Sequence, residues 1–397
     1  MPDNYRARQI LIITAIAIFA FLLGYAVYRI LTAGGKTAPI SPPQAPVIGS
    51  VGGFAVETPT LPYATPLQQP TLGLEQKIQE QTLLALANFS VVSPVINKKQ
   101  DGVLFYKKEG GSVYAADFAA NIQKNSNITI VGLTEANWSP ARDRAGVFYI
   151  DTDVLKSFLH TGSSSALSLP RDITSFSWSP DGKQFAYLLE MGEGGVGLFI
   201  SDASGKNTKQ EFSTPILDAQ IQWITPDTII FQTAPSGQAS GFVFKYSVAS
   251  RTLRRVFGPL YGLTTLWSPD AAHALMSITN GEGKNMVFYL YDASTNESKR
   301  LDFITLPDKC VWLTTKEFYC AAPNAFPSQA TMPDDYLRGE TVTQDRILSY
   351  NLDTQETTLI FSGGAMDIAN LAVTTKKDYL IFVNRTDGIL WRYKLAQ

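Results

Sequence analysis

Length and charge set the first limits on this chain. Its 397 residues are enough for two ordinary domains or for one large repeat domain with appendages. The 33 Lys and Arg residues are balanced by 35 Asp and Glu residues, for a net charge of -2. Because a nucleic-acid-binding protein needs clustered positive charge to displace phosphate counterions, this balance argues against nucleic acid as a partner.

The first strong pattern is an uncharged apolar run, ILIITAIAIFAFLLGYAV, over residues 10–27. With Arg8 and Arg29 at its flanks, it is long enough to cross a bilayer as a helix at about 1.5 Å per residue. A cleaved signal peptide is the alternative, but its apolar core is normally shorter, roughly 7–15 residues. We therefore expect a short cytoplasmic tail over residues 1–8 and a transmembrane helix over residues 9–31.

The orientation of this helix follows from its flanking charges. Arg6 and Arg8 precede the span, and Arg29 and Lys36 follow it, so the count of positive charges is nearly even. The opposite topology would translocate a tail that carries two arginines and an α-amine. We expect the N-terminus in the cytoplasm and the bulk of the chain outside it.

A proline-rich segment follows, and residues 38–70 contain eight prolines and a single charge, Glu57. Proline fixes φ and removes backbone donors, so such a segment forms an extended tether more readily than a packed domain. We interpret residues 32–73 as a linker, and recognition of the proline-rich tract by a partner is the alternative.

After the linker the chain becomes repetitive. Five of the six tryptophans occupy equivalent positions, with spacings of 40, 45, 44 and 45 residues. They are Trp138, Trp178, Trp223, Trp267 and Trp312. Two further units lack the tryptophan but keep its surroundings, and the alignment places Val92 and Ala372 at that position. The chain thus contains seven units.

Each unit has the same internal order. A short apolar strand ends at the tryptophan, a polar turn such as SPDG follows, and then come an aromatic-rich strand, a third strand and a more polar fourth strand. Four strands in about 45 residues are typical of one propeller blade, and blades around an axis bury each other's faces. We therefore predict an all-β fold, a seven-bladed β-propeller of four-stranded blades over residues 74–397. The tryptophans would pack between neighbouring blades.

The repeat words WSPDGKQFAYL and GLFISDASG resemble the TolB-type, WD-repeat-like propeller repeat of bacterial envelope proteins. The propellers of prolyl-oligopeptidase relatives use similar repeats. The resemblance covers roughly residues 82–397 and implies a propeller fold, although only two units keep the full Ser-Pro-Asp. It is specific for fold and says little about function.

The last unit supplies only three strands before Gln397. A closed ring needs a fourth, and residues 82–86, just before the first inner strand, can supply it. For residues 75–81 a helix and a strand remain equally open, because good helix formers are frequent there.

Signs of catalysis are weak. The word GEGGVG at residues 192–197 matches a dinucleotide-binding pattern, but a strand follows it where the pattern needs a helix, so we interpret it as a hairpin loop. The two histidines, His160 and His273, lie far apart without Cys or carboxylates at metal-ligand spacing. We expect no catalytic, cofactor or metal site.

The sixth unit is about 15 residues longer than its neighbours, and the excess lies between its second and third strands. Five residues make this insertion a candidate binding loop: Asp334, Asp335, Tyr336, Arg338 and Glu340. In a propeller such loops emerge on the same face as the connections between blades. The insertion is either a recognition loop or a solvated cover of the rim.

Two connections between blades are unusually apolar for turns, FGPLYGL at residues 257–263 and STPILDAQ at residues 213–220. Leu260 and Tyr261 in the first of these either line the mouth of the ring as a binding patch or plug the central channel.

The only two cysteines, Cys310 and Cys320, lie on adjoining strands of the sixth unit. A hairpin centred on Thr315 places them opposite each other, within disulfide range. A register shift of one residue would place the side chains on opposite faces of the sheet. Reduced, buried thiols are the alternative, and an oxidising compartment would permit the bond.

Together these patterns predict a single-pass membrane protein whose propeller lies outside the cytoplasm and acts as a non-enzymatic protein-binding or scaffold module of the cell envelope. Fold alone supports this only by analogy. The alternative is a carbohydrate-active enzyme that uses carboxylates at the propeller mouth. Facing Asp or Glu residues with shifted pKa values at the axis would favour the enzyme.

Overall fold

The computed structural model describes residues 82–395, apart from residues 162–164 and 193. The predicted transmembrane helix over residues 9–31, the linker over residues 32–73 and residues 74–81 lie outside this part of the chain. Among the residues that are described, no helix is long and apolar enough to span a bilayer.

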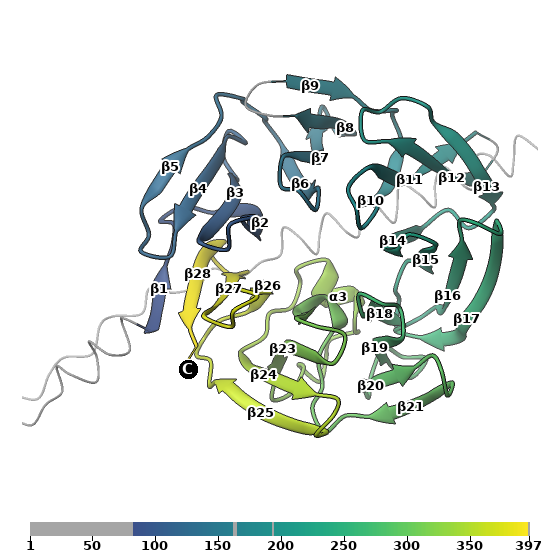
Figure 1. Ribbon diagram of the computed structural model, residues 1–397. Coiled ribbons are helices and arrows are strands. Elements are labelled where there is room, and N and C mark those ends of the chain that lie inside the picture. The colour runs from purple at the N-terminus through teal and green to yellow at the C-terminus, as the bar shows by residue number, and fades with distance from the viewer. Residues whose placement is uncertain (1–81, 162–164, 193, 396–397) are drawn as a thin grey trace, which may run out of the picture. The chain divides into compact units, whose positions relative to one another are not determined.

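The described residues form seven antiparallel four-stranded sheets around a central channel, which confirms the predicted seven-bladed propeller (Figure 1). The innermost strands are β2 (Val91–Ile96), β6 (Leu133–Trp138), β10 (Ile173–Trp178), β14 (Ala219–Thr225), β18 (Thr264–Trp267), β22 (Cys310–Trp312) and β26 (Ile368–Val373). The second strands are β3 (Gly102–Lys107), β7 (Arg144–Asp151), β11 (Gln184–Met191), β15 (Thr228–Thr233), β19 (His273–Ile278), β23 (Glu317–Pro323) and β27 (Tyr379–Asn384).

The outer half of each blade is built in the same way. The third strands are β4 (Val113–Asp117), β8 (Val154–Thr161), β12 (Gly195–Asp202), β16 (Ser240–Ser247), β20 (Val287–Asp292), β24 (Asp345–Asn351) and β28 (Ile389–Lys394). The outermost strands are β5 (Ile122–Lys124), β9 (Ser165–Ser168), β13 (Lys209–Thr214), β17 (Thr252–Tyr261), β21 (Glu297–Arg300), β25 (Glu356–Phe361) and β1 (Leu83–Ala85). Blade one begins with β2, and blade seven contains β26, β27, β28 and β1.

The ring closes between the two ends of the described chain, as predicted. The outermost strand of blade seven is β1, which pairs antiparallel with β28. Just beyond β1, the Leu86 amide donates a hydrogen bond to the Leu390 carbonyl (2.7 Å). Leu86 is fully buried among side chains of blades seven and one. This closure ties the first described residues to the last.

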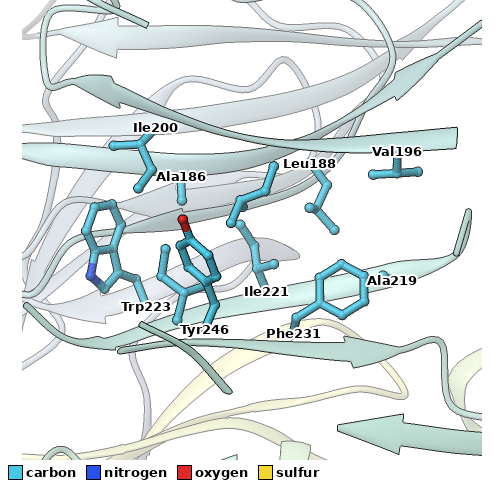
Figure 2. Packing of buried hydrophobic residues seen from close by; sticks show 11 residues of the cluster. Ala186, Leu188, Val196, Ile200, Ala219, Ile221, Trp223, Phe231 and Tyr246 are labelled. Carbon is cyan, nitrogen blue, oxygen red and sulfur yellow. The ribbon is translucent and has the colours of Figure 1, made fainter. Parts of the chain in front are cut away.

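The apolar core lies between the blades. Among the described residues, seven clusters of buried side chains each join two consecutive blades. Figure 2 shows one of them, in which Trp223 and Phe231 of blade four pack against Leu188 and Ile200 of blade three. Burial of a large apolar side chain contributes about 1.5–3 kcal/mol, so the blades stabilise each other.

The repeated tryptophans pack in these interfaces. Each of the five ends, or nearly ends, an innermost strand and faces the preceding blade. Three of their indole N–H groups also donate to backbone carbonyls of that blade. These bonds join Trp138 to Ser93 (2.8 Å), Trp178 to Asn137 (2.8 Å) and Trp312 to Leu266 (3.3 Å). The tryptophan of the repeated motif thus joins consecutive blades.

The structure corrects the alignment of the two units that lack tryptophan. In blade three, Trp178 pairs with the residue seven positions later on the second strand. In blades one and seven, Ile96 and Val373 have a pairing partner at this same distance, so these two residues are the equivalents of the tryptophan. Val92 and Ala372 have partners at other distances. The Ser-Pro of blade one belongs to a β-bulge inside β2, so its likeness to the turn after the tryptophans was misleading. In blade seven the alignment was wrong by one residue, and neighbouring residues of a strand point to opposite faces of the sheet. Val373 therefore packs toward blade six, whereas Ala372 packs toward blade one.

Strand direction defines two faces of the propeller. Because consecutive strands of a blade run antiparallel, the loops between second and third strands emerge on the same side as the connections from blade to blade. We call this side the cap face, since the insertion of blade six lies there. The remaining turns emerge on the opposite face.

The two cysteines lie directly opposite each other in the β22–β23 hairpin and are joined by a disulfide. Both are buried between blades five and six.

We expect the Cys310→Ala/Cys320→Ala variant to have a free energy of unfolding lower by about 3 kcal/mol, because the bond closes a short loop in the unfolded chain. Urea unfolding followed by tryptophan fluorescence measures this change. Reduction of the unmodified chain should lower its stability similarly. Two alkylated thiols in the folded, non-reduced protein would contradict the bond.

Candidate functional site

The insertion of blade six folds into a compact structure on the cap face. We call residues 324–344, between β23 and β24, the cap, and it contains the short helix α3 (Asp334–Leu337). Three of its buried side chains pack on Leu306, which precedes β22. They are Ala330, Met332 and Tyr336. The cap is therefore part of the fold.

The cap is also bonded to three other blades. Its partners lie in the loops between the second and third strands of blades four, five and seven. The contacts are Asp334 with Ser236 Oγ (2.9 Å) and the Gly237 amide (2.6 Å), Lys284 Nζ with the Gln329 and Ala330 carbonyls (2.7 Å each), and the Arg385 guanidinium with the Tyr336 carbonyl (2.5 Å). The cap thus covers the ring from blade four to blade seven.

A buried ionic cluster lies beneath the cap. Lys309 Nζ contacts Asp345 Oδ2 (2.7 Å) and Asp367 Oδ1 (2.6 Å), and it donates to Tyr336 Oη and Thr343 Oγ1 (2.8 Å each). All three charged side chains are almost completely buried. Lys309 lies on η1 (Pro307–Lys309), and Asp367 lies just before β26, so the cluster joins the cap to blades six and seven.

The pKa values of the three charged groups shift in different directions. Burial acts to lower the pKa of Lys309, but Tyr336, Asp345 and Asp367 together raise it. Burial raises the pKa of Asp345 in spite of Lys309. For Asp367, burial is outweighed by Lys309 and by the Tyr336 and Thr343 hydroxyls, so its pKa is lowered. Of the two carboxyls, Asp367 is thus the more acidic.

The structure places the five residues of the predicted binding loop in different environments. Tyr336 is buried and Asp334 is bonded to blade four, so neither side chain is free for a partner. Arg338 bonds Asp335 (2.6 Å) and Glu340 (2.9 Å) on the surface. The charged residues mainly stabilise the cap, and its exposed apolar side chains are others, Leu337 and Val342.

The other half of the channel is open. A cavity of 880 Å³, which we call the channel cavity, is lined mainly by the innermost strands β26, β2 and β6 and is bordered by Leu337 of α3. Its charged residues are Lys108, Arg142, Arg385 and Glu135. A second hollow of 470 Å³ continues along β6, β10 and β14 and shares Glu135 with the first.

Bulges shape the wall of the channel cavity. The pairing of β2, β6 and β26 with their neighbours is interrupted by register shifts, and Ser93 and Asn370 there have φ values of 49° and 51°. By contrast, β18 and β22 pair without a shift. A bulge bends a strand and increases its twist. The bulged strands therefore border the open part of the channel.

Exposed apolar side chains gather on the cap face. Of the twelve large hydrophobic residues that are exposed in the described chain, eight lie in or beside its loops. They are Val131, Ile150, Val154, Leu155, Leu217, Tyr261, Leu337 and Val342. The other four lie on outermost strands: Ile122, Leu167, Leu253 and Leu359. The distribution is strongly one-sided.

Leu260 and Tyr261 belong to β17, so of the predicted connection over residues 257–263 only residues 262 and 263 lie outside a strand. Gly258, with a φ of 104°, allows an irregular register that keeps the strand paired as far as Tyr261. Leu260 packs between blades four and five, and neither residue lines the two channel hollows. They do not plug the channel, although Tyr261 stays 40% exposed on the cap face.

The described residues contain no group of three or more His, Cys, Asp or Glu side chains that could hold a metal ion. Gly195, Val196 and Gly197 of the GEGGVG word begin β12, which pairs antiparallel with β11, so a strand and not a helix follows at this place. Asp308 is the unusual acid. Its pKa is raised by desolvation, although the residue is exposed.

Comparisons with known proteins identify the fold. No known protein family matches the chain, and no curated protein matches it. Similar structures include oligogalacturonate lyase in complex with manganese (TM-score 0.54, 11% identity, 79% of this chain and 93% of the other). The propeller domain of the Trilobed protease from Pyrococcus furiosus has a TM-score of 0.53 and 12% identity over 77% and 95% of the two chains. TolB from Acinetobacter baumannii has a TM-score of 0.45 and 15% identity over 69% and 64%. At such low identities, the likeness to the lyase and to the Trilobed protease domain shows a shared propeller fold alone.

Proposed function

We propose that this protein is a membrane-anchored, extracytoplasmic propeller that binds a protein partner through its cap face and catalyses no reaction. The observation that carries the proposal is the concentration of exposed apolar side chains on that face. Scattered exposed hydrophobic residues are normal on a soluble surface, whereas their gathering on one side marks an interaction site.

The anatomy of the cap face fits a protein interface. Val131 is 77% exposed. At the turn between the second and third strands of blade two, Ile150, Val154 and Leu155 are exposed as well. One exposed apolar residue of the cap face, Leu337, borders the polar channel cavity, so anchoring contacts and specific polar contacts are offered on the same face. The packed cap provides a fixed surface, which lowers the entropic cost of binding.

The anchor and the location rest on sequence and on cysteine chemistry. The apolar run over residues 10–27 and the proline-rich linker would hold the propeller away from a bilayer. The disulfide between Cys310 and Cys320 favours an oxidising compartment, because such bonds are rare in the reducing cytoplasm. Both arguments favour a propeller outside the cytoplasm.

Asp308 supports the alternative, a carbohydrate-active enzyme, because a raised pKa suits a general acid. Glycoside hydrolysis needs a second carboxylate on the other side of the scissile bond. Asp345, whose pKa is also raised, is bonded to Lys309 inside the protein and is not presented to a substrate. We therefore favour binding over catalysis.

Crosslinking on intact cells tests the proposal. Cells that produce the full chain are treated with a membrane-impermeant crosslinker, and the captured partners are compared between variants. Val131→Asp/Val154→Asp places charge in the apolar part of the cap face and should reduce the captured partner about tenfold or more. Leu253→Asp/Leu359→Asp makes the same chemical change on outermost strands and should leave capture unchanged.

Equal capture by both double variants would contradict binding through the cap face. Crosslinks that form only after lysis would contradict the external location. Deletion of the cap is an unsuitable test, because it would remove Tyr336 and Thr343 from the buried Lys309.

A further inference from the structure

The channel cavity carries excess positive charge. Among the described residues, three cations and one carboxylate line it: Lys108, Arg142, Arg385 and Glu135. None of these three cations forms an ion pair with an acidic side chain of the described residues. Their hydrogen bonds go to backbone carbonyls instead, from Lys108 to Leu133, for example (3.1 Å).

The cations come from three different blades. Lys108 follows β3 of blade one, Arg142 lies in the first turn of blade two, and Arg385 follows β27 of blade seven. Lys108 and Arg385 lie toward the cap face, and Arg142 lies at the opposite end of the innermost strands. Positive charge is therefore distributed along the depth of the channel cavity and not confined to one rim.

Positive charge in a confined space has a cost. The guanidinium of Arg142 donates to the Ser139 carbonyl (3.2 Å), and burial lowers its pKa. Removing a cation from water without a counter-charge is unfavourable, and an anion that enters the cavity would offset this cost. Arginine is well suited to this task, because its planar donors match a carboxylate.

We propose that the channel cavity receives an acidic segment of the partner protein. The inference rests on the proposed function, because the same partner would dock on the apolar cap face and insert this segment beside Leu337. A volume of 880 Å³ lies in the range of specific ligand sites, roughly 300–1,000 Å³.

The wall of the cavity favours a peptide over a sugar acid. Sugar rings are commonly held against aromatic faces, and among the described residues the only aromatic one that lines the cavity is Trp138. Its ring is packed between blades one and two against Tyr106, and its indole N–H is bonded to Ser93. Acidic side chains on a flexible backbone need no such platform.

A peptide titration tests this inference. The full chain, purified in a non-ionic detergent, is titrated into fluorescent hexaglutamate and hexaglutamine peptides, and binding is followed by anisotropy. We expect saturable binding of hexaglutamate only, weakened by added salt because the contacts are ionic. Lys108→Gln/Arg142→Gln should weaken it about tenfold or more. Arg254→Gln/Arg255→Gln removes the same charge from outermost strand β17 and should change it less than about twofold.

Three results would overturn the inference: no saturable binding of hexaglutamate, equal weakening by the two double variants, or binding of hexagalacturonate in place of the peptide. Comparison of the two peptides on the unmodified chain remains decisive if a variant folds poorly. If the partner is still captured on cells while hexaglutamate fails to bind, the acidic segment is wrong and the cap-face proposal stands.

Discussion

Replacing Lys309 with methionine is expected to lower the free energy of unfolding by about 3–5 kcal/mol. The substitution leaves Asp345 and Asp367 buried without their cation, and both carboxylates are inaccessible to water. It also removes the donor to Tyr336 and Thr343, which bind the cap to the ring. Urea unfolding followed by tryptophan fluorescence measures the change.

Lys316→Met is the matched control. Lys316 pairs with Asp353 at a similar distance, 2.8 Å, but both side chains are more than 60% exposed. Such a pair contributes roughly 0–1 kcal/mol, so this variant should remain nearly as stable as the unmodified protein. Equal stability of the two methionine variants would contradict a structural role for the ionic cluster.

A triple variant separates charge from packing. Adding Asp345→Asn and Asp367→Asn to Lys309→Met removes the stranded charges while keeping oxygen acceptors for the Ile368 amide and the Tyr336 hydroxyl. We expect part of the lost stability to return, because a neutral polar group costs less to bury than a charge. No recovery would mean that shape, and not charge, determines the stability of the site.

The propeller was predictable because its signals are periodic. The tryptophans recur in five consecutive blades, and the short last unit pointed to closure by residues 82–86, where β1 lies. Placement within a blade was less secure where the tryptophan is missing. The Ser-Pro of β2 matches the turn that follows the tryptophans in sequence, yet it forms a β-bulge. Similarity of a short motif does not determine how the backbone pairs.

The candidate site was harder to predict, because its residues do not recur at regular intervals in the sequence. Lys309, Asp345 and Asp367 belong to different strands or loops, and only the ring brings them together. The same is true of Lys108, Arg142 and Arg385. The apolar cap face left a partial signal, since the connection that contains Leu217 is visibly apolar in the sequence. Assigning every loop of the seven units to one of the two faces would have shown the other apolar residues of the cap face.

The cap also explains why the channel has two unlike halves. On the side of blades five and six, regular innermost strands and the buried cluster beneath the cap form a packed region. On the side of blades seven, one and two, bulged strands border the open channel cavity. One insertion thus provides both a rigid covering and the border of a binding cavity.

Ring closure should depend on Leu86. Leu86→Ala is expected to lower the free energy of unfolding by about 2–5 kcal/mol, because this side chain is fully buried between blades seven and one and its removal leaves a cavity. Urea unfolding by fluorescence and by circular dichroism should still show one coincident transition, at a lower midpoint. Leu359→Ala on β25, where the side chain is 57% exposed, should change stability by less than about 0.5 kcal/mol. Equal midpoints for the two variants would mean that the closure through β1 does not stabilise the ring.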